Sequence, residues 1–348
     1  MPEGEYEIIL FYKYVRIADP KRLCEEQEEI CTRLGLKGRC IIATEGINAT
    51  FEGTKENIQK YIYELQNNSK FKNTCPVEDR EGSQRISIFD GIHFKLSSGT
   101  GNAFPKLSVK VRREIVSLHL GTCDIDPNQI TGVHLKPEEL HEWLKTGREF
   151  YIVDMRNVYE HKVGHFENSI LPPIENFRDL PKVVEQIAHL KNKTVLTVCT
   201  GGVRCEKASG FLITQGFTDV YQLDGGIVSY MEKYPNEDFQ GKLYVFDARV
   251  VMMPARPDFL GGGFYTDDIK HKIIGKCDAC REQSENYVNC ANPVCHRHFI
   301  ICEKCIDDAA GNTFCPGGCV LSRHGRPVRQ PAQSEFQGGG GKISPVQV

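Results

Sequence analysis

One stretch of this chain, residues 194–216, constrains its fold more than any other. Thr194–Val198 is a run of apolar and β-branched residues, which is typical of a buried strand. The run ends at Cys199, two glycines lie in the loop that follows, and residues 206–215 have the pattern of a helix. The sequence therefore predicts a cysteine at the point where a buried strand turns into a helix.

Such a junction stabilises a thiolate. Gly201 and Gly202 allow the loop to curl so that its N–H groups point inward, and the helix adds the positive end of its dipole. Arg204 would add a permanent charge or hold an anion above the sulfur. Because the thiolate is the nucleophilic form, we expect Cys199 to be catalytic, supported by Gly201, Gly202 and Arg204. The alternative interpretation is an inert cysteine buried at a strand end.

Strand and helix patterns alternate from residue 131 to residue 240. Pro137 and the acidic residues beside it are typical of a helix start, and a second helix is expected at 177–190. Strands are expected at 150–156, 194–198 and 219–223. Repeated units of this kind predict a mostly parallel sheet with helices on both faces. Ligands bind at the carboxyl ends of the strands in such sheets, which is where Cys199 would lie.

The first 120 residues have a different pattern. Aromatic and β-branched runs predict strands, and apolar positions at helical spacing predict helices. In chain order we expect a strand at 6–15, a helix at 18–34, strands at 39–43 and 48–51, a helix at 54–65 and a strand at 85–89. This β-α-β-β-α-β order is that of the ferredoxin-like α+β unit, which many unrelated functions use.

A local basic strip lies near the end of that unit. It comprises Lys106, Lys110, Arg112 and Arg113, with Lys95 upstream. The whole chain has a net charge of -3, so any binding of nucleic acid would have to depend on such a patch. A phosphate backbone would be attracted to the strip. The alternative interpretation is a solvated charged face.

Cysteines are concentrated near the C-terminus, where eight of the fifteen lie within residues 277–319. They form pairs at the spacing of zinc knuckles: Cys277 and Cys280, Cys290 and Cys295, Cys302 and Cys305, Cys315 and Cys319. These would fill two tetrahedral zinc sites, with either crossed or sequential pairing, and His296 and His298 are further candidates. Four thiolates leave no open coordination position, so we expect structural zinc. The alternative is reduced cysteines that pack as small hydrophobic residues.

The N-terminus has no basic start, long apolar stretch or cleavage signal, and no run approaches the length of a membrane span. We therefore expect a cytoplasmic protein without a disulfide framework. The predicted organisation is a ferredoxin-like domain, a linker, an α/β domain, a cysteine-rich region that opens with a strand at 244–250, and a disordered tail. These parts correspond to residues 1–120, 121–130, 131–240, 241–322 and 323–348.

Residues 199–204, CTGGVR, resemble the active-site loop of the rhodanese (sulfurtransferase) superfamily. There, a cysteine opens a six-residue loop and carries sulfur as a persulfide, whereas related phosphatases have a loop one residue longer with a later arginine. The position that would hold this arginine is Cys205. The resemblance covers residues 131–240 and implies a rhodanese α/β domain. Cys205 would form a reversible disulfide with Cys199 or pack beside it, and we expect packing.

Further segments are similar to one rhodanese-domain family, the oxygen-dependent tRNA uridine hydroxylases that make 5-hydroxyuridine at wobble position 34. These segments are Thr44–Gly53, Phe104–Lys110, Cys199–Ser209 and Phe246–Val250. The resemblance implies that Cys199 is the essential cysteine, that tRNA is the partner and that molecular oxygen is the co-substrate. No nucleotide cofactor is evident. The basic strip would then be the candidate tRNA-binding surface.

Attack of the Cys199 thiolate on carbon 6 of uracil would make carbon 5 electron-rich enough to react with oxygen. Because such chemistry needs shielding from water, we expect the first domain to close over the thiol pocket. Two other functions remain open. One is a sulfurtransferase that carries a persulfide on Cys199 and works with a sulfur carrier. The other is a non-enzymatic, zinc-stabilised RNA-binding or scaffold protein.

Overall fold

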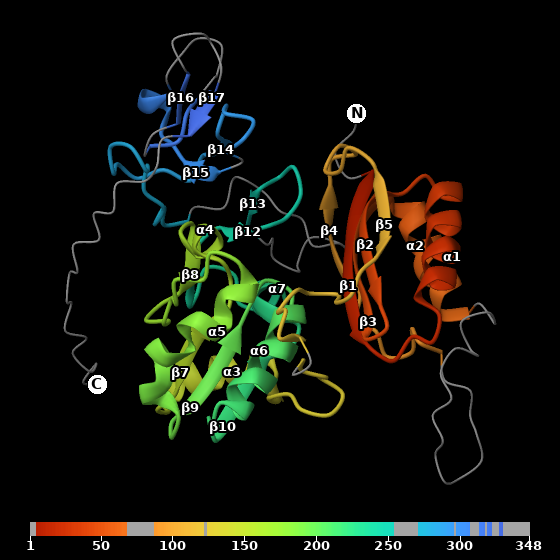
Figure 1. The fold of residues 1–348 in the computed structure, drawn as a ribbon, viewed down its shortest axis with the longest axis horizontal. Helices are drawn as coiled ribbons and strands as arrows, with labels where there is room; N and C mark the ends of the chain where they lie inside the picture. Colours follow the sequence, from red (N-terminus) through yellow and green to blue (C-terminus); the bar gives the residue numbers. More distant parts are fainter. Residues whose placement is uncertain are drawn as a thin grey trace.

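The computed structural model describes residues 5–67, 87–121, 124–253, 271–295, 297–306, 313–316, 319–321 and 327–329. Figure 1 shows an N-terminal unit in red to orange, a central unit in green and a small C-terminal unit in blue. Within the described ranges, none of the helices has the length and hydropathy needed to span a membrane.

The N-terminal unit is a five-stranded sheet with two helices on one face. Its elements are β1 (Tyr6–Tyr14), α1 (Pro20–Arg33), β2 (Lys37–Ala43), β3 (Gly46–Thr54), α2 (Lys55–Asn67), β4 (Lys95–Gly99) and β5 (Leu107–Val111). The strand order is β4-β1-β3-β2-β5, with β5 parallel to β2 and the other neighbours antiparallel. The predicted ferredoxin-like order is confirmed, and β5 extends it by one strand.

The position predicted for the last strand of that order, 85–89, is wrong. Residues 88–91 form a turn, before which the Ser87 N–H donates to Asp90 Oδ2 at 2.7 Å, and residues 85 and 86 lie outside the described ranges. The strand that completes the order is β4. Ile88 and Phe89 are each 1% exposed and pack in the core. Their apolar pattern therefore reflects burial and not strand pairing.

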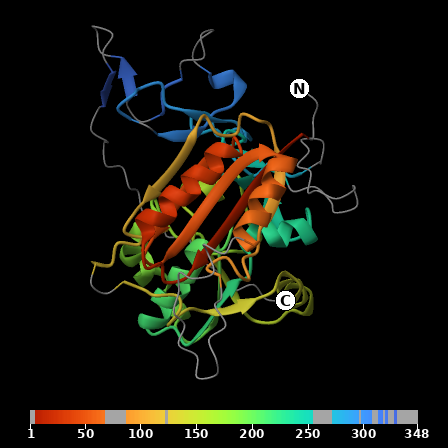
Figure 2. The same ribbon diagram turned by 90° about the vertical axis from the view of Figure 1, so that its right-hand side faces the viewer.

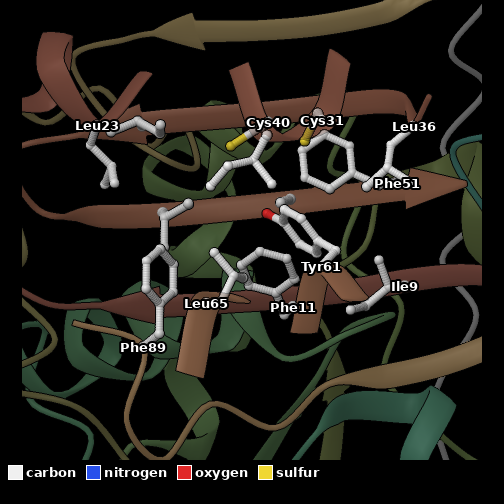
Figure 3. Packing of buried hydrophobic residues seen from close by; sticks show 14 of the residues in the cluster. Ile9, Phe11, Leu23, Cys31, Leu36, Cys40, Phe51, Tyr61, Leu65 and Phe89 are labelled. Atoms are coloured by element: carbon white, nitrogen blue, oxygen red, sulfur yellow. The ribbon is translucent and has the colours of Figure 1, made fainter. Parts of the chain in front are cut away.

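β1 has two apolar faces because side chains alternate along a strand. Ile9 and Phe11 pack with Tyr61 beneath α1 and α2 (Figure 3). Leu10 and Tyr12 point to the other face of the sheet. Figures 1 and 2 show α1 and α2 on the side of the sheet that is turned away from the central unit. The face without helices is therefore the one that meets the central unit.

The central unit is a parallel sheet covered by helices. Its sheet has the order β6-β10-β9-β7, all parallel, which confirms the predicted architecture. Its elements are β6 (Val133–Leu135), α3 (Pro137–Thr146), β7 (Tyr151–Asp154), α4 (Val158–His161), β8 (Gly164–Phe166), η3 (Phe177–Asp179), α5 (Leu180–Val183), η4 (Val184–Leu190), β9 (Thr194–Val198), α6 (Val203–Thr214), β10 (Asp219–Leu223) and α7 (Gly226–Lys233). The single helix predicted at 177–190 is divided into two 3₁₀ turns and a short α-helix around Pro181, which has no N–H to donate.

The strand predicted at 244–250 is instead part of a hairpin. After β11 (Phe239–Gly241), β12 (Leu243–Tyr244) pairs with β13 (Val251–Met252). In the loop between them, the Asp247 carboxylate accepts hydrogen bonds from the N–H and the guanidinium of Arg249. These local bonds turn the chain where the apolar pattern alone indicated a longer strand.

The C-terminal unit has few regular elements. They are β14 (Tyr287–Asn289) paired with β15 (His298–Ile300), η5 (Glu303–Cys305), and β16 (Cys319–Leu321) paired with β17 (Pro327–Arg329). β17 falls within the segment predicted to be a disordered tail, whose other residues lie outside the described ranges. The predicted linker also contacts the core, since Ile125 is 6% exposed and packs in the central unit.

Candidate active site

The strand-to-helix junction forms where the sequence indicated it. β9 ends at Val198, Cys199 follows, and α6 begins at Val203 instead of residue 206. Gly202 precedes the helix with a φ of +99°, a conformation that glycine adopts without strain. This turn completes the loop early and lets the helix start beside the cysteine.

Backbone N–H groups converge on the sulfur of Cys199, which is fully buried. The Gly202 N–H donates to Sγ at 3.2 Å, and the N–H groups of Arg204 and Cys205 also favour the thiolate. Burial raises the pKa of Cys199, but the Cys205 side chain, the charge of Arg204 and the N–H groups of Cys205 and Arg204 outweigh it and lower the pKa to about 6. The sulfur is therefore largely ionised at neutral pH.

Cys205 is a buried free thiol beside Cys199. Burial, the hydrogen bond to Cys199 and the negative charge of Cys199 raise the pKa of Cys205 well above its ordinary value. Cys205 therefore stays protonated and donates its S–H to the ionised sulfur.

The guanidinium of Arg204 is paired with a carboxylate. It forms a two-pronged ion pair with Glu160 of α4, with Nη2 2.7 Å from Oε2, and lies 3.3 Å from Thr200 Oγ1. Glu160 is fully buried. Sequence reasoning missed it, although Glu160 accepts from the Asn157 N–H as a helix-capping residue, a spacing that the sequence shows.

A cavity of about 370 Å³ lies between the N-terminal sheet and the Cys199 loop. The sheet and the loop are in close contact, because a Cβ added to Gly201 would lie 3.0 Å from Leu10 Cδ2 and one added to Gly202 would lie 2.8 Å from the Tyr12 hydroxyl. The first unit therefore covers the thiol loop, as expected for chemistry shielded from water. The loop residues that line the cavity are Thr200, Gly201, Val203 and Arg204.

Lys95 lies in the wall of this cavity and not in the basic strip. It is 5% exposed, and its Nζ donates to the carbonyl oxygen of Gly201 at 2.7 Å. Grouping Lys95 with the strip is therefore wrong. The reason is topological, since β4 and β5 form opposite edges of the sheet.

The other four basic residues, Lys106, Lys110, Arg112 and Arg113, are all exposed along or beside β5. Lys110 is aligned with Ile41 of β2, and Ser108 with Arg39. Ile41 and Arg39 both line the cavity. Because aligned residues share a face of the sheet, Lys110 lies on the cavity side of this edge.

Lys207 joins the N-terminal unit to α6. Its fully buried ammonium lies 2.8 Å from Glu45, 3.1 Å from Glu114 and 3.2 Å from Asp124. Glu45 belongs to the turn between β2 and β3, so this cluster of charges holds the sheet against the helix that follows the thiol loop. Sequence reasoning did not single out these residues.

The eight C-terminal cysteines form two groups with crossed pairing. One group contains Cys277, Cys280, Cys302 and Cys305, and the other contains Cys290, Cys295, Cys315 and Cys319. Within each group the sulfur atoms all lie within 4.8 Å of one another, and two pairs are 3.5 and 3.7 Å apart. A tetrahedron of sulfurs around zinc has an edge of about 3.8 Å, so both groups fit this metal. His298 is engaged by the Tyr244 hydroxyl at 2.9 Å, and His296 lies outside the described residues.

Comparisons with known proteins agree with this architecture. Family models match residues 6–115 as a UPF0176 acylphosphatase like domain, 136–233 as a rhodanese-like domain and 240–320 as a rhodanase C-terminal region. A protein from Cytophaga hutchinsonii is 40% identical over 323 residues, which cover 93% of this chain and 92% of that protein. One from Bacillus cereus (strain AH820) is 37% identical over 335 residues, covering 95% and 94%. Both relatives are named tRNA uridine(34) hydroxylase, and this chain belongs to the tRNA uridine(34) hydroxylase family.

Proposed function

We propose that this protein uses molecular oxygen to hydroxylate the wobble uridine, position 34, of tRNA to 5-hydroxyuridine. The observation that carries the proposal is the Cys199 loop, which directs a backbone N–H at the sulfur beneath a cavity covered by the N-terminal sheet, in a chain whose relatives at 37–40% identity bear this name. Cys199 is the nucleophile, and Gly201, Gly202 and Arg204 support its ionised form.

The reaction begins when the Cys199 thiolate adds to carbon 6 of uracil, which leaves carbon 5 electron-rich. Carbon 5 then reacts with oxygen. One oxygen atom stays on carbon 5, and the other leaves as water after an external donor supplies two electrons and two protons. Loss of the proton from carbon 5 and of the sulfur from carbon 6 restores the ring and the thiolate.

The cavity supplies an aromatic surface for the base. Phe246 lines the cavity and is 47% exposed. Its ring packs edge-on against Tyr244, with centroids 5.4 Å apart, and the Arg204 guanidinium lies 5.7 Å from its centroid. Unstacked RNA bases bind by stacking on aromatic side chains of this kind. We assign Phe246 the role of stacking the wobble base or its neighbour.

The tRNA backbone follows the β5 edge of the sheet towards the cavity. The exposed residues Lys106, Lys110, Arg112 and Arg113 provide positive charge there, and Lys110 shares the cavity side with Arg39. Neutralising the strip weakens tRNA binding and flattens its salt dependence, because fewer counterions are released on binding.

Two structural zinc ions hold the C-terminal unit against the active site. The Tyr287 hydroxyl donates to the carbonyl oxygen of Tyr159 in α4, the helix that carries Glu160. Lys162 directly follows α4, and its Nζ lies 3.1 Å from Asp278 Oδ1. In the sequence, Asp278 lies between Cys277 and Cys280 of one cysteine group. Zinc therefore acts through the position of α4 and takes no part in the chemistry.

Nucleoside mass spectrometry of tRNA tests the proposal. Cells that lack the protein are expected to lose 5-hydroxyuridine, wild type to restore it only in the presence of oxygen, and Cys199→Ser to fail. Restoration by Cys199→Ser at the normal rate would contradict the proposed role of the thiolate. A stable persulfide on Cys199 that cyanide discharges, with tRNA unchanged, would instead support a sulfurtransferase.

A further inference from the structure

Lys95 is a buried cation that the chemistry described so far does not use. It begins β4 in the N-terminal unit, yet its ammonium reaches the thiol loop of the central unit and donates to the Gly201 carbonyl oxygen at 2.7 Å. The ammonium also lies 5.3 Å from the centroid of the Tyr12 ring. Among the residues that the structure describes, it forms no salt bridge with a carboxylate. Burying an ammonium in this way is costly unless its charge has a use or a partner.

The carbonyl that Lys95 contacts belongs to the same peptide unit as the N–H that holds the thiolate. The peptide between Gly201 and Gly202 presents its oxygen to Lys95 and its N–H to Cys199 Sγ, at 2.7 and 3.2 Å. A cation at the carbonyl end polarises the peptide, which makes its N–H a stronger donor to an anion. The ammonium and the sulfur thus lie at opposite ends of one peptide dipole.

We propose that Lys95 is a positioning residue that fixes the Gly201–Gly202 peptide and, through it, stabilises the thiolate of Cys199. The N-terminal unit therefore supplies part of the activation of a nucleophile that the central unit carries. This inference rests on the proposed role of Cys199 and not on the identity of the substrate.

The groups around Lys95 give the inference a pH signature. Burial lowers the pKa of Lys95 to about 8, against the opposing charges of Cys199, Glu232, Asp224 and Glu206. His93 lies near Lys95, and Arg204, Cys205, Tyr12 and Tyr14 surround Cys199. Cys199 is ionised above about pH 6, and Lys95 is charged below about pH 8. Activity is therefore expected to be highest between these two values. Cys199 stays ionised above pH 8, so the alkaline limb reflects loss of the ammonium that fixes the Gly201–Gly202 peptide.

The test is a titration of the Cys199 thiolate in the full-length, zinc-loaded protein. The ultraviolet absorbance of thiolates is measured against pH for each protein and for the same protein carrying Cys199→Ser. Subtracting the second curve from the first cancels the signal of the other cysteines and leaves that of Cys199. Lys95→Met is expected to raise the midpoint of Cys199 by about one pH unit, a tenfold change in the ionisation constant. Lys95→Gln keeps a donor without the charge and is a second variant in case Lys95→Met does not fold. It is expected to shift the midpoint in the same direction.

Two further variants separate charge from general disturbance. Lys95→Arg keeps the charge and is expected to hold the midpoint near that of wild type while moving the alkaline limb of activity to higher pH. Lys21→Met, at an exposed position on α1, is expected to change nothing.

Lys95→Met is also expected to lower kcat with little change in KM for tRNA. A folded Lys95→Met or Lys95→Gln protein with the wild-type midpoint would overturn the inference. Because the titration needs no substrate, it can succeed even if the proposed reaction is wrong.

Discussion

At the scale of single residues, the site depends on small groups that meet at one sulfur atom. Gly202 provides both the N–H that contacts Cys199 and the space that the Tyr12 hydroxyl occupies.

The low pKa of Cys199 also affects stability. The pKa of Cys199 in the folded protein lies below that of an unfolded cysteine, so ionisation of Cys199 stabilises the fold. The full contribution is present at pH values above the pKa of the unfolded cysteine. That contribution is lost as the pH falls through about 6.

Cys205 offers a prediction at this scale. Cys205→Ala removes the donor that faces the thiolate and is expected to raise the pKa of Cys199 by about one unit, because a hydrogen bond to a charged group contributes about 1.5–3 kcal/mol. Cys205→Ser keeps a donor and serves as the matched control. The same absorbance titration measures both. Equal midpoints for alanine and serine would show that Cys205 only fills space.

At the scale of elements, the site is assembled from segments that are not neighbours in the chain. β1 covers the thiol loop with one face and forms the N-terminal core with the other. α4 supplies Glu160 to Arg204, and the β12–β13 loop brings Phe246 to the cavity. The catalytic loop therefore keeps its shape only while these elements remain packed around it.

The loop between β12 and β13 yields the second prediction. Phe246→Leu is expected to weaken binding of an anticodon stem-loop about tenfold, because stacking of one base on an aromatic ring is worth about 1–3 kcal/mol. Phe246→Trp should retain binding. The control is Tyr63→Leu, an aromatic residue on α2 that is 67% exposed and outside this cavity. Fluorescence anisotropy provides the dissociation constants, and equal losses at both positions would argue against a specific stack.

At the scale of the whole molecule, a buried cluster of ion pairs joins the N-terminal unit to the central unit. Lys207 is surrounded by three carboxylates from the N-terminal unit and the segment that follows it. Burial raises the pKa of Glu45, while the Lys207 ammonium opposes this shift. The cluster therefore links the position of the sheet to α6, and so to the loop that carries the nucleophile.

Removing that ammonium leaves carboxylates buried without compensation. Lys207→Met is expected to lower the free energy of unfolding by about 3–5 kcal/mol. The loss should shrink at acid pH, where the carboxylates become protonated. Lys193→Met breaks a surface pair with Glu149 and should cost less than about 1 kcal/mol. Urea unfolding at several pH values measures both, and a pH-independent loss for Lys207→Met would contradict the electrostatic explanation.

The cysteine groups give the last prediction. The purified protein is expected to contain two zinc ions, one for each group of four cysteines, and Cys302→Ser should remove one of them. Metal analysis by mass spectrometry measures the content. A strong chelator should then lower thermal stability and activity together, because the zinc sites support the contact of Tyr287 with α4. Full activity without metal would contradict this structural role.

The sequence by itself determined the features that depend on neighbouring residues. A β-branched run, two glycines and a helical pattern produce the strand, the loop and the helix around Cys199 wherever this segment is buried. The same holds for the ferredoxin-like order of elements and for the presence of four cysteine pairs. Among these, the strand at 85–89 was misplaced, because burial and pairing leave the same apolar pattern, and the helix after Cys199 begins three residues earlier than its pattern indicated.

Only the tertiary structure decided which distant residues complete the site. Lys95 and Gly201 are 106 positions apart, and Glu160 and Arg204 are 44 apart, so no local spacing indicates either contact. The crossed pairing of the cysteines was equally open, since both arrangements satisfy the same spacing. The physical reason is that long-range contacts depend on how sheet edges and faces are packed, and residue periodicity specifies a face without specifying what it meets.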